Sequence, residues 1–273
     1  MFSYRDMVVI FIDVMGTKNN TKFEDKYCIH RLFHEEARSN EERNQSHVIY
    51  KRNVRSFSDC AYIIYDYKDG IEDSRKDNMK LLQIAMYNTS LSVLKILDAG
   101  YLVRGGVSFG NAFIDDLGFF GPAIEEAYKL ESDYADVPII ALPEELGKRY
   151  REWDDKATNK KWVKLLLTSR PYLVEQTDDK YYLNVFYQLE ALGDSMLYED
   201  GSSVSLDGIK KSILKVIDRD QKLYPKSSVV SDGCKRKKSS IYEKLEWMKD
   251  YILSRQNKLN PNVSALSGIV HDV

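Results

Sequence analysis

The sequence has few of the features that mark secreted or membrane-spanning proteins. Its 273 residues include only three cysteines, Cys28, Cys60 and Cys234. They are odd in number and form no CxxC pair, which argues against a disulfide framework and favours a reducing, cytoplasmic compartment. No apolar run approaches the roughly 18–20 residues needed to cross a bilayer. The N-terminus has no basic region followed by an apolar stretch, so we expect neither a membrane anchor nor a signal peptide.

Net charge and histidine are also scarce, and this narrows the possible functions. A formal net charge of −2 provides no general attraction to nucleic acid or to an anionic membrane, so neither partner is expected. An anionic substrate would have to be bound by local positive charges. No Ser-His-Asp or Cys-His set stands out, and no zinc spacing is seen among the four histidines, His30, His34, His47 and His271.

Hydrophobic patterning predicts a mixed α/β protein. Residues 7–14 form a continuous, β-branched apolar run that is typical of a buried strand. Residues 49–54 and 60–65 predict a hairpin with Asp59 at or near its tip. The other expected elements are loose helix over 20–44, helix over 79–99, strand over 101–110 with a hairpin partner over 111–115, helix from 122 to 131, strand over 137–142, a short helix from 143, strands over 162–167 and 181–189, and helices over 206–219 and 240–256.

This order of elements predicts the fold class. Strand, helix, hairpin, helix, hairpin, helix and strand follow one another, which is typical of an α/β (α+β) sandwich of the split-βαβ, ferredoxin-like or palm type. Its sheet is expected to be antiparallel, with helices and a C-terminal helical extension. Polar loop is expected over residues 227–238 and a mobile tail over 259–273.

Two carboxylates are the strongest candidates for chemistry. Asp13 ends an apolar strand, where a carboxylate is costly to bury unless it is paired or binds a cation. Asp59 lies in a hairpin that pairs beside this strand in the expected fold. Two carboxylates on adjacent strand ends can hold Mg²⁺ or Mn²⁺, which prefer oxygen ligands. The alternative is that Asp13 caps the following turn and Asp59 is an ordinary turn residue.

Four segments in the expected order resemble the class III nucleotide cyclases. Residues 11–17 (FIDVMGT) resemble the first metal motif of that family, and Ser58-Asp59 sits where its hairpin carries the second metal aspartate. Residues 104–110 (RGGVSFG) resemble the next strand. Residues 120–131 (FGPAIEEAYKLE) resemble the following helix, which in the family carries transition-state residues. The resemblance covers roughly residues 7–145.

Within that family the details are most similar to the pyrimidine cyclases of bacterial Pycsar antiphage defence. The Arg-Gly-Gly strand, the Gly-Pro-Ala helix start and the C-terminal helix over 242–251 carry this similarity. It implies conversion of UTP, favoured over CTP, into the 3′,5′-cyclic monophosphate and pyrophosphate. The product would act on a separate effector protein in antiviral defence.

The resemblance also implies the site residues, the cofactors and the assembly. Asp13, Asp59 and the Val14 carbonyl would bind two Mn²⁺ or Mg²⁺ ions per site. Arg104 and Lys129 would join the two aspartates as catalytic residues in a homodimer with composite active sites. Residues 1–200 would form the catalytic domain, and 201–273 an extension packed on the same domain. The implied nucleotide-binding residues are Phe11, Gly16, Thr17 and Arg55.

Departures from the family pattern leave alternatives open. Arg55 stands where purine cyclases usually place an adenine-reading Lys, and Gly118 or a neighbour replaces an adenine-reading Asp. Glu125 and Lys129 replace the Asn and Arg that steady the transition state. These changes argue against an ordinary adenylate cyclase. A purine cyclase and a degenerate cyclase domain that only binds nucleotide remain the alternative functions. For Arg55, Arg104 and Lys129 the alternative is surface solvation or a structural ion pair, and for Phe11 it is a place in the core.

Overall fold

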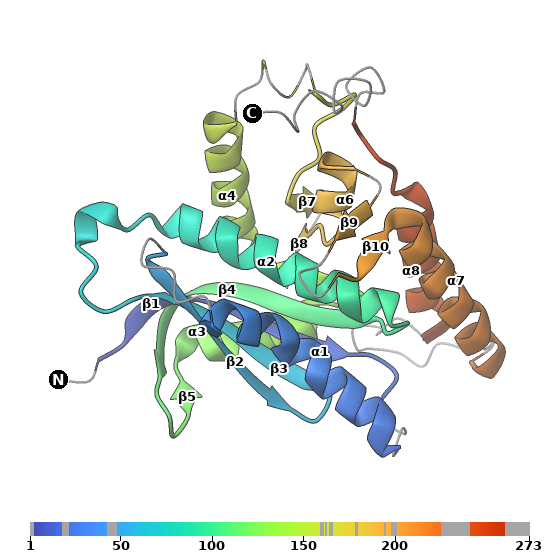
Figure 1. Ribbon diagram of the computed structural model, residues 1–273, viewed down its shortest axis with the longest axis horizontal. Helices are drawn as coiled ribbons and strands as arrows, with labels where there is room; N and C mark the ends of the chain where they lie inside the picture. Colours follow the sequence, from blue (N-terminus) through green and yellow to red (C-terminus); the bar gives the residue numbers. More distant parts are fainter. Residues whose placement is uncertain are drawn as a thin grey trace, which may run out of the picture.

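The structure is a computed structural model that describes most of the chain (Figure 1). The described residues are 3–17, 22–42, 48–158, 161, 163, 166–177, 180–193, 195–197, 201–224 and 241–259, with backbone only over 35–42. The first half of the chain consists of β1 (Arg5–Val14), α1 (Phe23–Glu42), β2 (Tyr50–Phe57), β3 (Cys60–Tyr67), α2 (Asn78–Asp98), β4 (Val103–Ile114), β5 (Phe119–Phe120) and α3 (Pro122–Lys129).

The second half, where the structure describes it, contains shorter strands and the longer helices α4, α7 and α8. Its elements are β6 (Ile140–Leu142), α4 (Glu144–Ala157), β7 (Val174–Gln176), β8 (Tyr181–Leu183), α6 (Tyr187–Ala191), β9 (Ser195–Leu197), β10 (Ser203–Ser205), α7 (Leu206–Leu223) and α8 (Ile241–Ser254). No helix within the described ranges is both long enough and apolar enough to cross a bilayer.

The main sheet has the split-βαβ order that the sequence predicts. Its strands follow the order β2-β3-β1-β4-β6-β8-β7. β1 lies between β3 and β4 and runs antiparallel to both, and among the described strand pairs only β4–β6 is parallel. The α/β sandwich with a mostly antiparallel, palm-type sheet is therefore confirmed.

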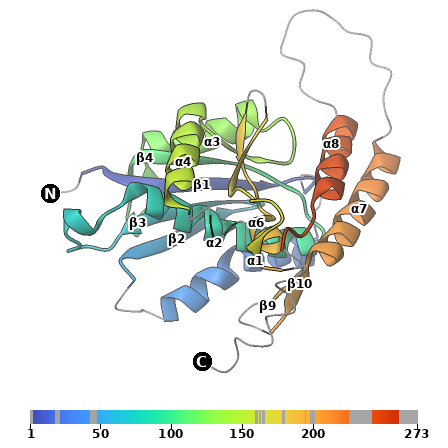
Figure 2. The same cartoon turned by 90° about the horizontal axis from the view of Figure 1, so that it is seen from above.

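Alternation along β1 divides the core between the two faces of the sheet. Val8, Ile10 and Ile12 point into the main core with α1 and α2. Met7, Val9 and Phe11 point to the opposite face, where they pack against α3. Figure 2 shows α1 and α3 on opposite sides of β1. Because side chains alternate along a strand, Asp13 lies on the α3 face.

Several expected elements differ from the structure. Residues 111–114, expected as the hairpin partner of the preceding strand, instead continue β4 itself. The hairpin partner of β4 is the two-residue β5. The strand expected over 162–167 is wrong for the described residues, because 161, 163 and 166 are helical and Leu167 makes only an isolated bridge. The strand expected over 181–189 ends at Leu183, and α6 follows. The loop over 227–238 and the tail from 260 lie outside the described residues.

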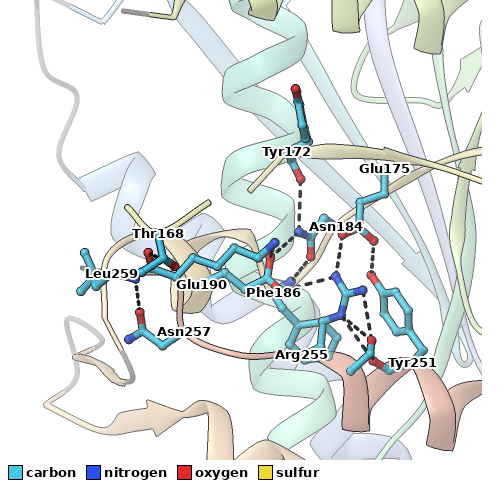
Figure 3. A network of polar contacts seen from close by, with 12 residues as sticks. Thr168, Tyr172, Glu175, Asn184, Phe186, Glu190, Tyr251, Arg255, Asn257 and Leu259 are labelled. Carbon is cyan, nitrogen blue, oxygen red and sulfur yellow. Dashed lines mark hydrogen bonds and ion pairs between the residues drawn. The ribbon is translucent and has the colours of Figure 1, made fainter. Parts of the chain in front are cut away.

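The C-terminal helices share the main core with the sheet. Ile209 and Ile213 of α7 and Leu245 and Met248 of α8 are buried in the cluster that contains the inner face of β1. Beyond α8, Arg255 forms an ion pair with Glu175 of β7 at 2.5 Å, and Figure 3 shows this contact within a larger polar network.

Candidate active site

The two predicted carboxylates lie at neighbouring ends of adjacent strands. Asp13 is next to the last residue of β1 and pairs in register with Cys60, the first residue of β3. Asp59 immediately precedes Cys60, and its carbonyl oxygen accepts a hydrogen bond from the Val14 amide at 2.9 Å. The β-ladder itself therefore brings Asp13 and Asp59 together.

The hairpin turn that carries Asp59 consists of two residues. Phe57 pairs with Cys60, which leaves Ser58 and Asp59 as the turn. Ser58 adopts a φ of 57°, and positive φ in a two-residue turn matches the right-handed twist of the flanking strands. Asp59 is therefore at the tip of the hairpin, as the sequence predicts.

The turn after β1 closes onto Asp59 through Thr17. Gly16 has a φ of 79°, which is readily adopted only by glycine. This reversal places the Thr17 side chain inward, where it is 3% exposed. The Thr17 hydroxyl lies 3.1 Å from the Val14 carbonyl oxygen and forms a short hydrogen bond with Asp59 Oδ2. Thr17 thus contacts two of the groups predicted to hold metal.

Two positively charged side chains, those of Lys26 and Arg104, lie beside the carboxylates. Lys26 of α1 places its Nζ 3.5 Å from Asp59 Oδ2. Arg104 of β4 lies opposite Asp13 in register and places Nη2 3.4 Å from Asp13 Oδ2. The same Arg104 nitrogen forms an ion pair with Glu131, which is 6% exposed. Arg104 therefore lies between a buried glutamate and the candidate metal carboxylate.

The two carboxylates differ in acidity. Burial raises the pKa of Asp13, the nearby charge of Asp59 adds to this, and the Arg104 guanidinium opposes it. Burial also acts to raise the pKa of Asp59, but hydrogen bonds from Thr17 and Ser58 and the charge of Lys26 outweigh it, so this pKa is lowered. The effect of the Asp59 charge on the pKa of Asp13 places the two carboxylates within electrostatic range of each other.

The donor set fits divalent cations of the Mg²⁺ and Mn²⁺ class. Two carboxylates and the Val14 carbonyl are hard oxygen ligands, and a positive ion would offset the burial and the lesser Asp59 repulsion that together raise the Asp13 pKa. No group of three or more His, Cys, Asp or Glu side chains suited to a metal occurs among the described residues. Substrate oxygens and water would have to complete the coordination, as is usual for Mg²⁺.

No described contact joins the other predicted site residues, Phe11, Arg55 and Lys129, to Asp13 or Asp59. Phe11 is 4% exposed and packs against Tyr62 and Tyr128, with ring centroids 4.8 and 5.5 Å away. Arg55 donates a hydrogen bond to the Asp115 carbonyl at 3.1 Å. Lys129 ends α3 with an exposed side chain, and its charge opposes the burial that raises the pKa of Glu126.

Comparison with known proteins identifies no family. No family model matches the chain, and no curated protein matches its sequence. Among solved structures, an adenylate/guanylate cyclase/hydrolase from Silicibacter pomeroyi is similar with a TM-score of 0.37 and 12% identity over 67% of this chain and 96% of that one. A bacterial light-regulated adenylyl cyclase is similar with a TM-score of 0.35 and 13% identity over 79% of this chain and 59% of that one.

Sequence reasoning missed two contributors to this site. Lys26 reaches Asp59 only because α1 folds back along the β2–β3 hairpin, and nothing in the local sequence indicates this. Glu131 lies in the π-helical turn Leu130–Tyr134 that continues α3. It belongs to the segment that resembles the family helix, but its pairing with Arg104 depends on the close approach of this turn to β4.

Proposed function

We propose that the protein is a nucleotide cyclase that closes a nucleoside triphosphate into its 3′,5′-cyclic monophosphate. The observation that carries this proposal is the placement of Asp13 and Asp59 at adjoining strand ends on a split-βαβ sheet. In this reaction the ribose 3′-oxygen loses its proton and bonds to the α-phosphorus. The bond from the α-phosphorus to the bridging oxygen breaks, and pyrophosphate leaves.

Asp13, Asp59 and the Val14 carbonyl would hold two Mn²⁺ or Mg²⁺ ions, which would supply positive charge at the attacking and leaving oxygens. The residues of the chain would position the substrate. Backbone N–H groups of Gly16 and Thr17 would contact the triphosphate, and Arg104 and Lys129 would neutralise phosphate oxygens. Arg55 would contact the base. No nucleophilic side chain is required, because phosphoryl transfer depends mainly on positioning and charge stabilisation.

A homodimer with composite sites would use the α3 face of the sheet. On this face α3 packs over β1, whereas Cys60 and Tyr62 of β3 remain partly exposed. Phe57 and Tyr128 add apolar surface there, at 81% and 51% exposure. Exposed aromatic side chains beside a partly buried apolar cluster favour a protein interface. In such a dimer, Lys129 of one protomer would complete the carboxylate site of its partner.

Base specificity and biological role extend this proposal further. We propose UTP, ahead of CTP, as the substrate, and a role in antiphage signalling through a separate effector. The support is that the Arg-Gly-Gly strand and the Gly-Pro-Ala helix start resemble those of the pyrimidine cyclases, and that Arg55 stands in place of an adenine-reading Lys. Incubation with each of the four NTPs and Mn²⁺, with products identified by mass spectrometry, tests this. A cyclic purine nucleotide as the main product would refute the pyrimidine assignment.

The carboxylate pair is tested by Asp13→Asn and Asp59→Asn. Each substitution removes one charged oxygen ligand at nearly constant volume. Because the missing charge would weaken the stabilisation of the transition state, we expect at least a roughly hundredfold loss of cyclase activity. Asp73→Asn is the matched control, since its carboxylate is exposed and pairs only with Lys76 among described contacts. Full activity in either site variant would exclude the metal assignment.

The composite site is tested by mixing inactive chains. Asp13→Asn and Lys129→Ala should each be inactive alone, but half of the dimers in an equal mixture would be heterodimers with one intact site. We therefore expect recovery of about one quarter of the parent activity. No recovery after subunit exchange would refute the shared site. Arg104 is unsuitable for this test, because it contacts Asp13 within one chain.

A nucleotide-binding domain without turnover is the second candidate. The observation that favours it is that both carboxylates already have partners within the chain, Arg104 at Asp13 and Lys26 at Asp59. Isothermal titration would show nucleotide binding in this case, with no release of pyrophosphate from any of the four NTPs. Release of pyrophosphate would exclude it.

A further inference from the structure

Two histidines of α1 converge on one hydroxyl group of the edge strand β2. His34 Nε2 lies 2.8 Å from Ser56 Oγ, and His30 Nδ1 lies 3.3 Å from the same oxygen. The two imidazole rings are 4.7 Å apart. Residues four apart on a helix lie on one face. The interpretation that the histidines have no zinc spacing was therefore wrong for His30 and His34, whose His-x-x-x-His spacing brings both rings together once α1 packs against β2.

We propose that His30 and His34 form a binding site for a borderline transition-metal ion such as Zn²⁺, Ni²⁺ or Cu²⁺. Imidazole nitrogens suit these ions, whereas Mg²⁺ and Mn²⁺ prefer oxygen ligands. The site is therefore chemically distinct from the Asp13–Asp59 pair. Both ring nitrogens contact the same atom, Ser56 Oγ, so the two rings already converge, and an ion shared by them would replace these two hydrogen bonds.

The surroundings leave room for the ion and its remaining ligands. His30, His34 and Ser56 line an open surface pocket of about 510 Å³. Arg55 also lines this pocket, but its guanidinium is engaged by the Asp115 carbonyl at 3.1 Å. No third His, Cys, Asp or Glu joins the pair within the described part of the chain. Water and the Ser56 hydroxyl would supply the other ligands.

Metal binding here would fix α1 to the hairpin that carries Asp59. Lys26, His30 and His34 are each four residues apart and share one face of α1. Lys26 contacts Asp59 at the turn of the hairpin, while the histidines contact Ser56 three residues earlier. An ion at the pair would therefore hold the same helix face that presents Lys26 to Asp59.

Calorimetric titration with Ni²⁺ tests this site without depending on cyclase activity. The starting chain carries His47→Gln and His271→Gln, so that His30 and His34 are its only imidazoles. We expect one Ni²⁺ per chain at this pair. His30→Gln or His34→Gln should weaken binding by roughly tenfold or more, since one of two nitrogen ligands is lost. Glutamine retains a side chain that can hydrogen-bond with Ser56.

Nuclear magnetic resonance of ¹⁵N-histidine-labelled chain with Zn²⁺ identifies the ligands directly. Both ring-nitrogen signals of the pair should shift on addition of Zn²⁺ and not on addition of Mg²⁺. Asp59→Asn should leave the shifts unchanged, which separates this site from the proposed carboxylate site. Ni²⁺ affinity that is unchanged in the His30→Gln/His34→Gln chain, or Zn²⁺ addition that leaves both rings unshifted, would overturn the proposal.

Discussion

At the scale of single residues, the candidate site is held by contacts between opposite charges. Lys26 lies against Asp59 at 3.5 Å, and Arg104 lies against Asp13 at 3.4 Å. These two side chains balance the negative charge of the carboxylates. In the proposed metal site, a divalent cation would have to compete with Lys26 and Arg104, so both side chains would lower the affinity of the carboxylates for metal.

Replacing Lys26 should therefore strengthen metal binding. In Lys26→Met the Asp59 carboxylate loses its ammonium partner while much of the aliphatic stem remains. We expect the affinity for Mn²⁺ without nucleotide to rise roughly two- to fivefold, in line with the ~0.5–1 kcal/mol of a partly exposed ion pair. Mn²⁺ binding followed by electron paramagnetic resonance measures this.

Lys148→Met is the control for this change. It removes the same net charge from α4, where Lys148 pairs with Glu144, and should leave the affinity for Mn²⁺ unchanged. Weaker Mn²⁺ binding in Lys26→Met would contradict the competition and would instead make Lys26 a contributor to the site.

Tyr62 provides a test of the sheet face that α3 leaves partly open. Burial, followed by the charges of Cys60 and Tyr128, raises its pKa to about 12 from the ordinary value of 10. The unfolded chain then loses this proton first, so folding stability falls as pH rises from about 10 to about 12. We expect Tyr62→Phe to lose less stability than the parent between pH 9 and pH 11, as measured by urea unfolding. Equal losses in the two chains would exclude this contribution.

At the scale of elements, the close packing of β4 against β1 and α3 places Arg104. A methyl group at Gly105 would collide with the backbone of Phe11, and one at Gly106 would collide with the Ala127 carbonyl and Leu130. Gly105 therefore allows β1 to lie close to β4, and Gly106 allows the end of α3 to do so. This approach brings Glu131 to Arg104, and Arg104 to Asp13.

Gly106→Ala should disturb this packing. The added methyl group meets backbone atoms of α3, which cannot move aside without shifting the helix, so we expect a loss of about 1–3 kcal/mol in the free energy of unfolding. Gly110→Ala is a matched control in the same strand, because nothing lies within 4 Å of the added atom. Urea unfolding of both variants makes the comparison, and equal stabilities would show that α3 does not constrain β4 here.

At the scale of the whole molecule, the C-terminal segment is joined to the sheet by a buried polar network. Figure 3 shows Arg255 between Glu175 of β7 and Glu190 of α6. Its Nη1 lies 2.5 Å from Glu175 Oε1 and 3.4 Å from Glu190 Oε1. Glu190 is 1% exposed and also accepts a hydrogen bond from Asn184 at 2.9 Å. Together with the buried faces of α7 and α8, this network supports, for the described residues 201–224 and 241–259, the prediction that the C-terminal extension packs on the same domain as the sheet.

Arg255→Met tests how much of the stability depends on this network. The substitution leaves the buried Glu190 carboxylate without its guanidinium partner, and removing one member of a buried ion pair costs ~3–5 kcal/mol. Lys258 also contacts Glu190 at 3.4 Å, so we expect the lower end of this range in urea unfolding. Arg219→Met is the control, since its ion pair with Asp220 lies at the surface and should contribute less than about 1 kcal/mol.

Local sequence patterns determined the elements that carry strong periodicity. The apolar run ending at Asp13, the hairpin around Asp59 and the helix over 78–98 all appear within a few residues of the predicted bounds. These segments are long, and their hydrophobic period is set by local geometry alone. The predicted strand over 162–167 was wrong because a short apolar run is compatible with either a strand or a helix, and its neighbours decide between the two.

The sequence by itself therefore determined the split-βαβ fold and the two strand ends that carry Asp13 and Asp59. Only the tertiary structure decided which charges face them. Lys26, Arg104 and Glu131 come from three other parts of the chain. The contact of His30 and His34 with Ser56 likewise depends on how α1 lies along β2. Such contacts join residues far apart in the chain, and their geometry depends on packing that no local pattern encodes.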